Sequence, residues 1–350
     1  MNIDALFGNK ERITLGFFGG SITEGAGASE NQFCYCQRVT QLLQQRYPET
    51  VFETVNASIG GTGSSLGAFR LKEDLLVHQP DFVFVEYAVN DFDTEKELCQ
   101  RSMEGIVRQI LNYRASCPIV FIYTLSDEMA KKYYDKGLTP QSIQYHQEVA
   151  DYYHIPSINV GKPLYDTYTS QQLSVTEFLP DRVHPNDRGH EHYAQSILQV
   201  LPSVSFEIKY PKSPMRNNCL ETGVMVPAKD YLASGWEYHP QSMFGRYPEY
   251  ISSSQPGAKL TVPFHGSIIG IYHTIQKDSG MFSYSIDGKE STIFNSWDQY
   301  ALQFDRACYF IPASDLDEDA DHVLTIEVLE QKDEQSTGNM IRIGAFLMLK

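Results

Sequence analysis

The start of the chain lacks the basic and apolar pattern of a secretory signal peptide. Residues 1–12 include Asp4 and Glu11 and contain no apolar core, which such a signal requires. No apolar run approaches the roughly 20 residues that a membrane-spanning helix needs. The sequence therefore predicts a cytoplasmic protein with no membrane partner.

Cysteine is sparse and scattered, with only six residues and a single Cys-x-Cys pair, Cys34 and Cys36. Without a signal peptide we expect buried thiols rather than disulfides, and the spacing is not that of a zinc site. His190 and His192 lie close together in sequence, but residues two apart on a helix do not share a face. We therefore expect no metal and no cofactor.

Basic residues are few beside acidic ones. The chain has 28 Lys and Arg against 44 Asp and Glu, a formal net charge of -16. That balance argues against nucleic acid as a partner and fits a neutral or cationic substrate better. A hydrophobic content of 42% over 350 residues is that of a globular protein long enough for two domains.

Residue types that together perform acyl transfer occur in short segments far apart in the chain. Ser21 is a candidate nucleophile, His184 a base to activate it, and Asp181 a carboxylate to orient that base. An Asp three residues before a His can bring its carboxylate to Nδ1–H, which leaves Nε2 to take the serine proton. The ordinary alternative is that Ser21 and the Asp–His pair only form turns and helix caps.

Three turns that follow apolar runs each carry a residue suited to this chemistry. They are Ser21 after residues 13–18, Gly60 and Gly61 after residues 52–58, and Asn90 after residues 81–88. Open α/β folds bind ligands at the carboxyl edge of the sheet, so we expect these turns to meet there. Each turn taken alone has a purely structural explanation, since Gly and Asn favour turns. The occurrence of all three turns together indicates an active site.

Two of these turns offer donors for the oxyanion of a tetrahedral intermediate. The Asn90 carboxamide is neutral and donates N–H without adding a titrating group. Gly61 offers a backbone N–H, and a glycine lets the chain approach a substrate closely. The sequence predicts an oxyanion hole that includes both.

With these residues the chain resembles the SGNH/GDSL hydrolases over its N-terminal part, to about residue 200. The resemblance makes Ser21 the nucleophile of the first block, with its backbone N–H as a third oxyanion donor. Gly61 matches the glycine of the second block and Asn90 the asparagine of the third. Asp181 and His184 match the Asp-x-x-His of the fifth block.

Two positions depart from the family pattern. Gly20 stands where the family has an aspartate before the serine, and Ala88 stands where it has a glycine two places before the asparagine. Neither change removes a catalytic group, although the first alters hydrogen bonding around the nucleophile turn. Gly-Gly-Ser variants resemble the carbohydrate-esterase branches more than the lipase branch.

The organisation of the chain changes near residue 205. Before it, strand and helix patterns alternate, which implies a parallel sheet covered on both faces. The expected helices are residues 95–114 and 141–153, and the expected strands between and after them are 118–124 and 155–160. We therefore expect an α/β catalytic domain over residues 1–205, which the resemblance makes a flavodoxin-like, three-layer SGNH domain.

The remaining residues, 206–350, show short strand-like runs separated by turns, including a hairpin signal at Asp287 and Gly288. This pattern predicts an antiparallel β-sandwich of jelly-roll type as an accessory domain. Aromatic residues in it are candidates for stacking on sugars, although core packing is the more ordinary explanation. They are Trp236, Tyr238, Tyr247, Tyr250 and Trp297.

Together these features predict a serine esterase that removes short acyl groups, acetyl first, from sugars or oligosaccharides through an acyl-enzyme intermediate. Three alternatives stay open: a carbohydrate O-acetyltransferase, a lipase or thioesterase, and a non-catalytic carbohydrate-binding protein. The sequence does not identify the alcohol part of the ester, the acyl-chain preference or the oligomeric state.

Overall fold

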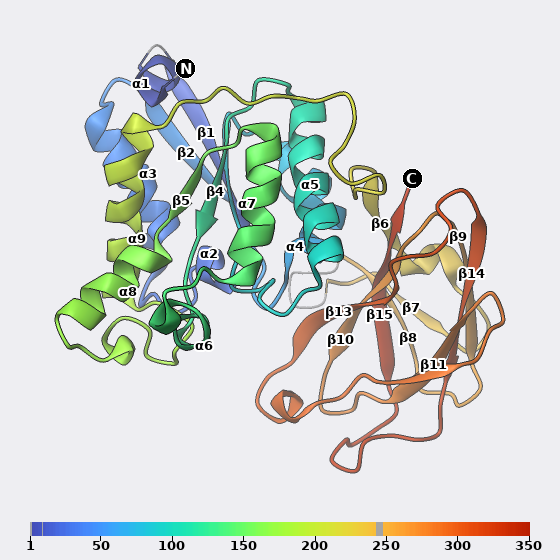
Figure 1. Cartoon of the computed structure of the whole chain (residues 1–350). Coiled ribbons are helices and arrows are strands. Elements are labelled where there is room, and N and C mark those ends of the chain that lie inside the picture. The colour runs from blue at the N-terminus through green and yellow to red at the C-terminus, as the bar shows by residue number, and fades with distance from the viewer. Residues whose placement is uncertain (1, 9, 243–247) are drawn as a thin grey trace. The chain divides into compact units, whose positions relative to one another are not determined.

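A five-stranded parallel sheet organises the first part of the chain in the computed structural model (Figure 1). The structure describes residues 2–8, 10–242 and 248–350. The strands run in the order β2-β1-β3-β4-β5, which is the flavodoxin-like order. Their bounds are β1 (Arg12–Gly19), β2 (Val51–Asn56), β3 (Phe82–Glu86), β4 (Ile119–Tyr123) and β5 (Ser157–Asn159).

The central strands are apolar because helices cover both faces of the sheet. Every residue of β3 and of β4 is buried, as expected for parallel strands enclosed on both sides. Phe17 of β1 stacks on Phe84 of β3 with ring centroids 4.7 Å apart. The α/β class predicted from the alternating pattern is confirmed.

The covering helices form two layers: α3 packs against α9 on one face, and α4, α5 and α7 pack together on the other (Figure 1). None of the helices in the described ranges has the length and apolarity to cross a bilayer. Their bounds are α1 (Ile3–Phe7), α2 (Ser21–Glu24), α3 (Tyr35–Arg46), α4 (Ser64–Asp74), α5 (Lys96–Tyr113), α6 (Asp127–Lys132), α7 (Gln141–Tyr153), α8 (Gly161–Ser170) and α9 (Asp187–Val200).

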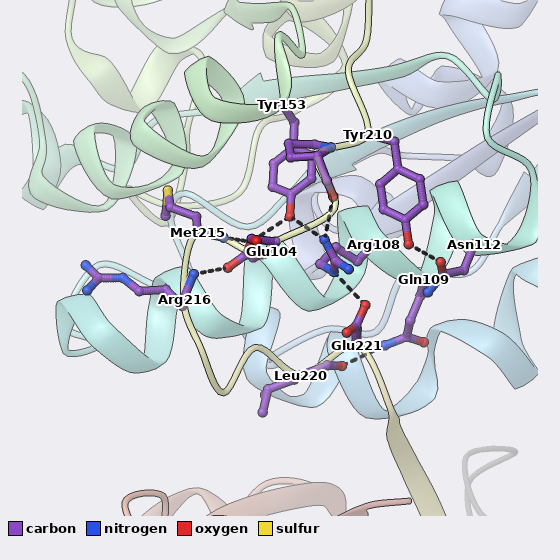
Figure 2. Close-up of polar contacts among 12 residues, drawn as sticks. Glu104, Arg108, Gln109, Asn112, Tyr153, Tyr210, Met215, Arg216, Leu220 and Glu221 are labelled. Atoms are coloured by element: carbon purple, nitrogen blue, oxygen red, sulfur yellow. Dashed lines mark hydrogen bonds and ion pairs between the residues drawn. The ribbon is translucent and has the colours of Figure 1, made fainter.

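The chain divides into two units, Met1–Glu221 and Thr222–Lys350. Residues 206–221, which the sequence pattern placed in the second domain, therefore lie in the first unit. Polar contacts with α5 explain this difference, as Figure 2 shows. The Arg216 N–H donates to Glu104 at 2.8 Å, and Glu221 forms an ion pair with Arg108 at 2.5 Å.

The second unit contains two antiparallel sheets. One has the order β13-β10-β15-β8-β7, with β6 also paired to β15, and the other has the order β12-β11-β14-β9. The strands are β6 (Gly223–Pro227), β7 (Glu237–His239), β8 (Tyr250–Ser253), β9 (Lys259–His265), β10 (Ile269–Ile275), β11 (Met281–Ile286), β12 (Thr292–Asn295), β13 (Arg306–Ala313), β14 (Asp321–Val328) and β15 (Ile341–Leu349).

Alternating side chains of these strands form a shared core. In β9, Leu260, Val262 and Phe264 are buried while their neighbours are exposed, the period of a strand with one covered face. They belong to one apolar cluster with residues of both sheets, among them Ile271 and Phe346. The predicted β-sandwich is thereby confirmed.

The aromatic candidates of the sandwich are mostly internal. Of the four that the structure describes, Trp236, Tyr250 and Trp297 are buried and Tyr238 is exposed. Tyr247 lies outside the described residues. Core packing is therefore the better explanation for the three buried rings.

The predicted hairpin joins β11 to β12. Asp287 and Gly288 have φ of 56° and 67°, the positive values that a tight hairpin turn takes at its two central positions. The six cysteines are free thiols, and all but the half-buried Cys308 are buried.

Candidate active site

The turns after β1, β2 and β3 meet at the carboxyl edge of the parallel sheet, as the sequence predicted. Ser21 begins α2 directly after β1, with Gly20 as the N-cap residue. A Cβ placed on Gly60 would lie 3.4 Å from the Cβ of Ser21, and one placed on Gly20 would lie 1.9 Å from Oδ1 of Asn90. The three turns are therefore in direct contact.

Ser21, His184 and Asp181 form a hydrogen-bonded chain. Nε2 of His184 lies 2.8 Å from Oγ of Ser21, and Nδ1 of His184 lies 2.6 Å from Oδ2 of Asp181. Because an ionised carboxylate only accepts, Nδ1 must donate to Asp181, which leaves Nε2 to accept from the serine hydroxyl. The arrangement can activate a nucleophile.

The Asp181 carboxylate is held by its own loop. Its Oδ1 accepts the backbone N–H groups of Val183 at 3.0 Å and His184 at 2.7 Å. Partial burial alone would raise the pKa of Asp181, but the hydrogen bonds from His184 and Val183 outweigh it and hold that pKa below its usual range. The hydrogen bonds therefore favour the ionised form of Asp181.

Gly61 is better placed than Gly60 to donate to a substrate. The Gly60 N–H already donates to Oε2 of Glu24 at 2.8 Å. Gly61 is exposed and has a φ of 72°, in the left-handed region that favours glycine. The N–H of Ser21, at the first position of α2, has no acceptor within its helix.

The sequence model of the GDSL-like Lipase/Acylhydrolase family matches residues 17–192, half of the chain. The chain belongs to this family. It is accordingly a carboxylic ester hydrolase, and the resemblance seen in the sequence is confirmed. No curated protein matches the chain.

Two solved structures share the fold along almost the whole chain. One is a two-domain esterase, CEX, active on acetylated mannans, with a TM-score of 0.84 and 21% identity, covering 99% of this chain and 94% of that one. The other is the same esterase co-crystallized with mannopentaose, with a TM-score of 0.82 and 21% identity, covering 99% and 93%. At this identity the likeness establishes a common two-domain fold.

Gly20 is the position where this GDSL-like acylhydrolase departs from the expected aspartate, and the structure gives a reason. The Asn90 side chain occupies the space that any Cβ at position 20 would enter, since the two atoms would be 1.9 Å apart. Only glycine lets Asn90 pack against the nucleophile turn in this way.

Arg70, which the sequence did not single out, joins the ends of three strands in this acylhydrolase. It is 1% exposed and stacks on the Phe18 ring at 4.2 Å. Its guanidinium donates to the Gly19 carbonyl at 3.3 Å, to the Tyr87 hydroxyl at 3.0 Å and to the Ala57 carbonyl. Arg70 thus fixes the backbone from which the Ser21 and Gly61 turns extend.

A second buried network lies behind Asn90. Asp91 accepts the N–H of Ser64, the first residue of α4, at 2.9 Å and pairs with Nε2 of His146 at 2.8 Å. Among the described residues, Asp91, Cys99 and His146 form the group whose ligand atoms could reach one metal ion. Hydrogen bonds already occupy both Asp91 oxygens and the His146 nitrogen, so the group fits a structural network better.

The two histidines weighed as a metal pair have separate partners. His190 accepts from the N–H of Tyr35 at 3.2 Å and donates to the carbonyl of Ala26 at 3.3 Å. Nε2 of His192 instead lies 3.0 Å from Oγ1 of Thr167. They act in packing around α9, consistent with their different faces on the helix.

Proposed function

We propose that this family member is a serine esterase that hydrolyses short-chain acyl esters, acetyl esters first, on carbohydrate substrates. The observation that carries the proposal is the hydrogen-bonded chain from Ser21 through His184 to Asp181. Ser21 is the nucleophile, His184 the general base and acid, and Asp181 the residue that orients the imidazole. The first unit is the catalytic one and the β-sandwich an accessory unit.

The reaction has two halves. Oγ of Ser21 attacks the ester carbonyl while its proton passes to Nε2 of His184, and the tetrahedral intermediate forms. Its oxyanion accepts hydrogen bonds from the N–H groups of Ser21 and Gly61 and from the Asn90 carboxamide. His184 then protonates the departing alcohol, which leaves an acyl-enzyme on Ser21. Water, activated by the same imidazole, releases the acid and restores the serine.

Two observations support a carbohydrate ester as the substrate. A fold shared over 99% of the chain is that of an esterase active on acetylated mannans. The formal net charge of -16 suits a neutral substrate better than an anionic one. Because the esterase with the shared fold acts on acetylated mannans, acetylated manno-oligosaccharides are the first substrates to test.

The test is the hydrolysis of p-nitrophenyl acetate by Ser21→Ala beside Ser170→Ala, an exposed serine of α8. We expect Ser21→Ala to lose turnover while its circular dichroism spectrum stays unchanged, and Ser170→Ala to retain full activity. Wild-type turnover in Ser21→Ala would overturn the assignment of the nucleophile.

Substrate class requires two further measurements. An acyl series from acetyl to octanoyl should favour acetyl, whereas a preference for octanoyl would indicate a lipase or thioesterase. Mass spectrometry of acetylated manno-oligosaccharides, with and without an added sugar acceptor, should show loss of acetyl groups to water. Transfer to the acceptor would instead indicate an O-acetyltransferase.

A further inference from the structure

Arg182 lies between Asp181 and His184 in the loop and adopts an unusual backbone conformation. Its φ is 71°, in the left-handed region that a long side chain rarely occupies. Asp181 precedes it directly and His184 follows two residues later. The conformation at Arg182 therefore determines how the chain turns between the carboxylate and the imidazole.

Asp127, the first residue of α6, holds Arg182 at two points. The N–H of Asp127 donates to the carbonyl of Arg182 at 2.8 Å, and Nη1 of Arg182 donates to Oδ2 of Asp127 at 2.7 Å. The side chain of Asp127 is only 9% exposed, whereas that of Arg182 is 58% exposed. The buried Asp127 is thus the fixed partner, and it restrains the exposed Arg182 of the loop.

The contact between Asp127 and Arg182 lies beside a cavity and a second cation. An open cavity of about 560 Å³ borders it, lined by Asp127, Arg182 and Val183 together with charged residues of α6. Lys131 shares the Asp127 carboxylate at 2.6 Å but is itself exposed. Burial alone would raise the pKa of Asp127, but Lys131 and Arg182 hold that pKa below its usual value, so the carboxylate is ionised.

We propose that Asp127 is a positioning residue: through its paired hydrogen bonds to Arg182 it holds the Asp181–His184 loop in the geometry that presents Nε2 to Ser21. The inference rests on the proposed function of the loop. It assigns to α6 a role in the reaction that acts through Arg182, since the Asp127 carboxylate pairs with Arg182 and Lys131. This contact, together with the hydrogen bond from the Arg182 N–H to the Leu179 carbonyl at 2.8 Å, maintains the strained backbone at Arg182.

Kinetics of a double-mutant cycle test the pairing. Asp127→Ala and Arg182→Ala should each lower kcat by about 10- to 100-fold, the loss that a displacement of about 1 Å can bring, with KM changed less than about twofold. The double variant should be no slower than the slower single variant, because both remove one interaction. Asp127→Asn, which can still accept one hydrogen bond, should recover part of kcat.

Lys131→Gln is the matched control, since it removes the other cation on the same carboxylate without touching the loop. It should keep wild-type kcat. Effects that add in the double variant, or single variants within twofold of wild type in kcat, would overturn the proposal.

A spectroscopic measurement separates this proposal from the proposed function. The proton on Nδ1 of His184, shared with Asp181 across 2.6 Å, should give a low-field proton NMR resonance, identified by its loss in His184→Gln. We expect the resonance in wild type and Lys131→Gln, and its loss or broadening in Asp127→Ala and Arg182→Ala. An unchanged resonance in those two variants would refute positioning even if Ser21→Ala proves inactive. A lost resonance would support it even if Ser21→Ala proves active.

Discussion

Oγ of Ser21 lies 2.8 Å from Nε2 of His184 although 163 positions separate the two residues in the chain. Contacts between the segments that follow each residue hold this pair together. Ser29, in the loop after α2, donates from its hydroxyl to Oδ2 of Asp187 at 2.6 Å and from its N–H to Oδ1 at 2.8 Å. Asp187 begins α9, whose N-cap is Asn186. The start of α9 is thus joined to the loop that follows α2, the helix that Ser21 begins.

Asn90→Ala should reduce kcat on the order of 10²-fold, because a lost oxyanion donor acts in the transition state. KM should change little, since the carboxamide contributes more to the intermediate than to the bound ester. Steady-state kinetics with p-nitrophenyl acetate measure both constants. A loss confined to KM would argue against a role for Asn90 in the oxyanion hole.

Gly20→Ala should impair the same donor without altering its chemistry. The new Cβ would meet Oδ1 of Asn90 at 1.9 Å, so the carboxamide must move away from the nucleophile turn. We expect kcat to fall by a factor similar to that of Asn90→Ala. The double variant should be little slower than either single variant, because both disable one group. Additive losses would show that Gly20 acts in another way.

Elements with strong local signals were predictable from the sequence. The apolar run of β3 and the long amphipathic helices α5 and α7 lie within a few residues of their expected ranges. The candidate triad could also be found in the sequence, since Asp181 and His184 are three residues apart and Ser21 follows a strand and two glycines. These features depend on neighbours in sequence, which a pattern can capture.

Elements that depend on distant partners were not predicted. Helix α6 and strands β7, β8 and β12 are short and have no continuous apolar run like that of β3, so no local pattern marks them. Arg70 is buried because three strand ends supply acceptors, whereas a sequence pattern places an arginine on the surface. Residues 206–221 belong to the first unit because of contacts with α5, and no local sequence motif predicts these contacts.

His190 should make the protein sensitive to acid. Burial lowers the pKa of His190 to about 4, from an ordinary value of 6.5, and the neutral ring already uses both nitrogens. Above pH 6.5 His190 is neutral in both the folded and the unfolded state, so its full contribution to stability is present. As the pH falls from 6.5 toward 4, only the unfolded state gains the proton and stability declines, by roughly 3 kcal/mol in all.

Urea unfolding at pH 7, 5 and 4 measures this effect when wild type is compared with His190→Gln. A glutamine amide can accept one hydrogen bond and donate another without titrating, so the variant should lose less stability between pH 7 and 4. Equal losses in the two proteins would assign the acid sensitivity to other groups.

Arg70→Met should destabilise the first unit by about 3–5 kcal/mol, because it leaves buried acceptors at the ends of three strands without a donor. Methionine preserves much of the side-chain length, so the loss reports hydrogen bonding more than a cavity. Arg70→Lys should be intermediate, since a single ammonium cannot reach acceptors spread around a planar guanidinium. Lys72→Met, at an exposed position of the same helix, is the matched control and should change stability by less than about 0.5 kcal/mol.

Activity adds a second readout for the same variants. Gly19, whose carbonyl accepts from Arg70 at 3.3 Å, lies two residues before Ser21. Losing this contact should therefore lower kcat in Arg70→Met at temperatures where the protein remains folded. Urea unfolding gives the stability, and initial rates at 15 °C and 25 °C give kcat in the folded state. An Arg70→Met protein as stable and as active as Lys72→Met would show that the strand ends hold their positions without this guanidinium.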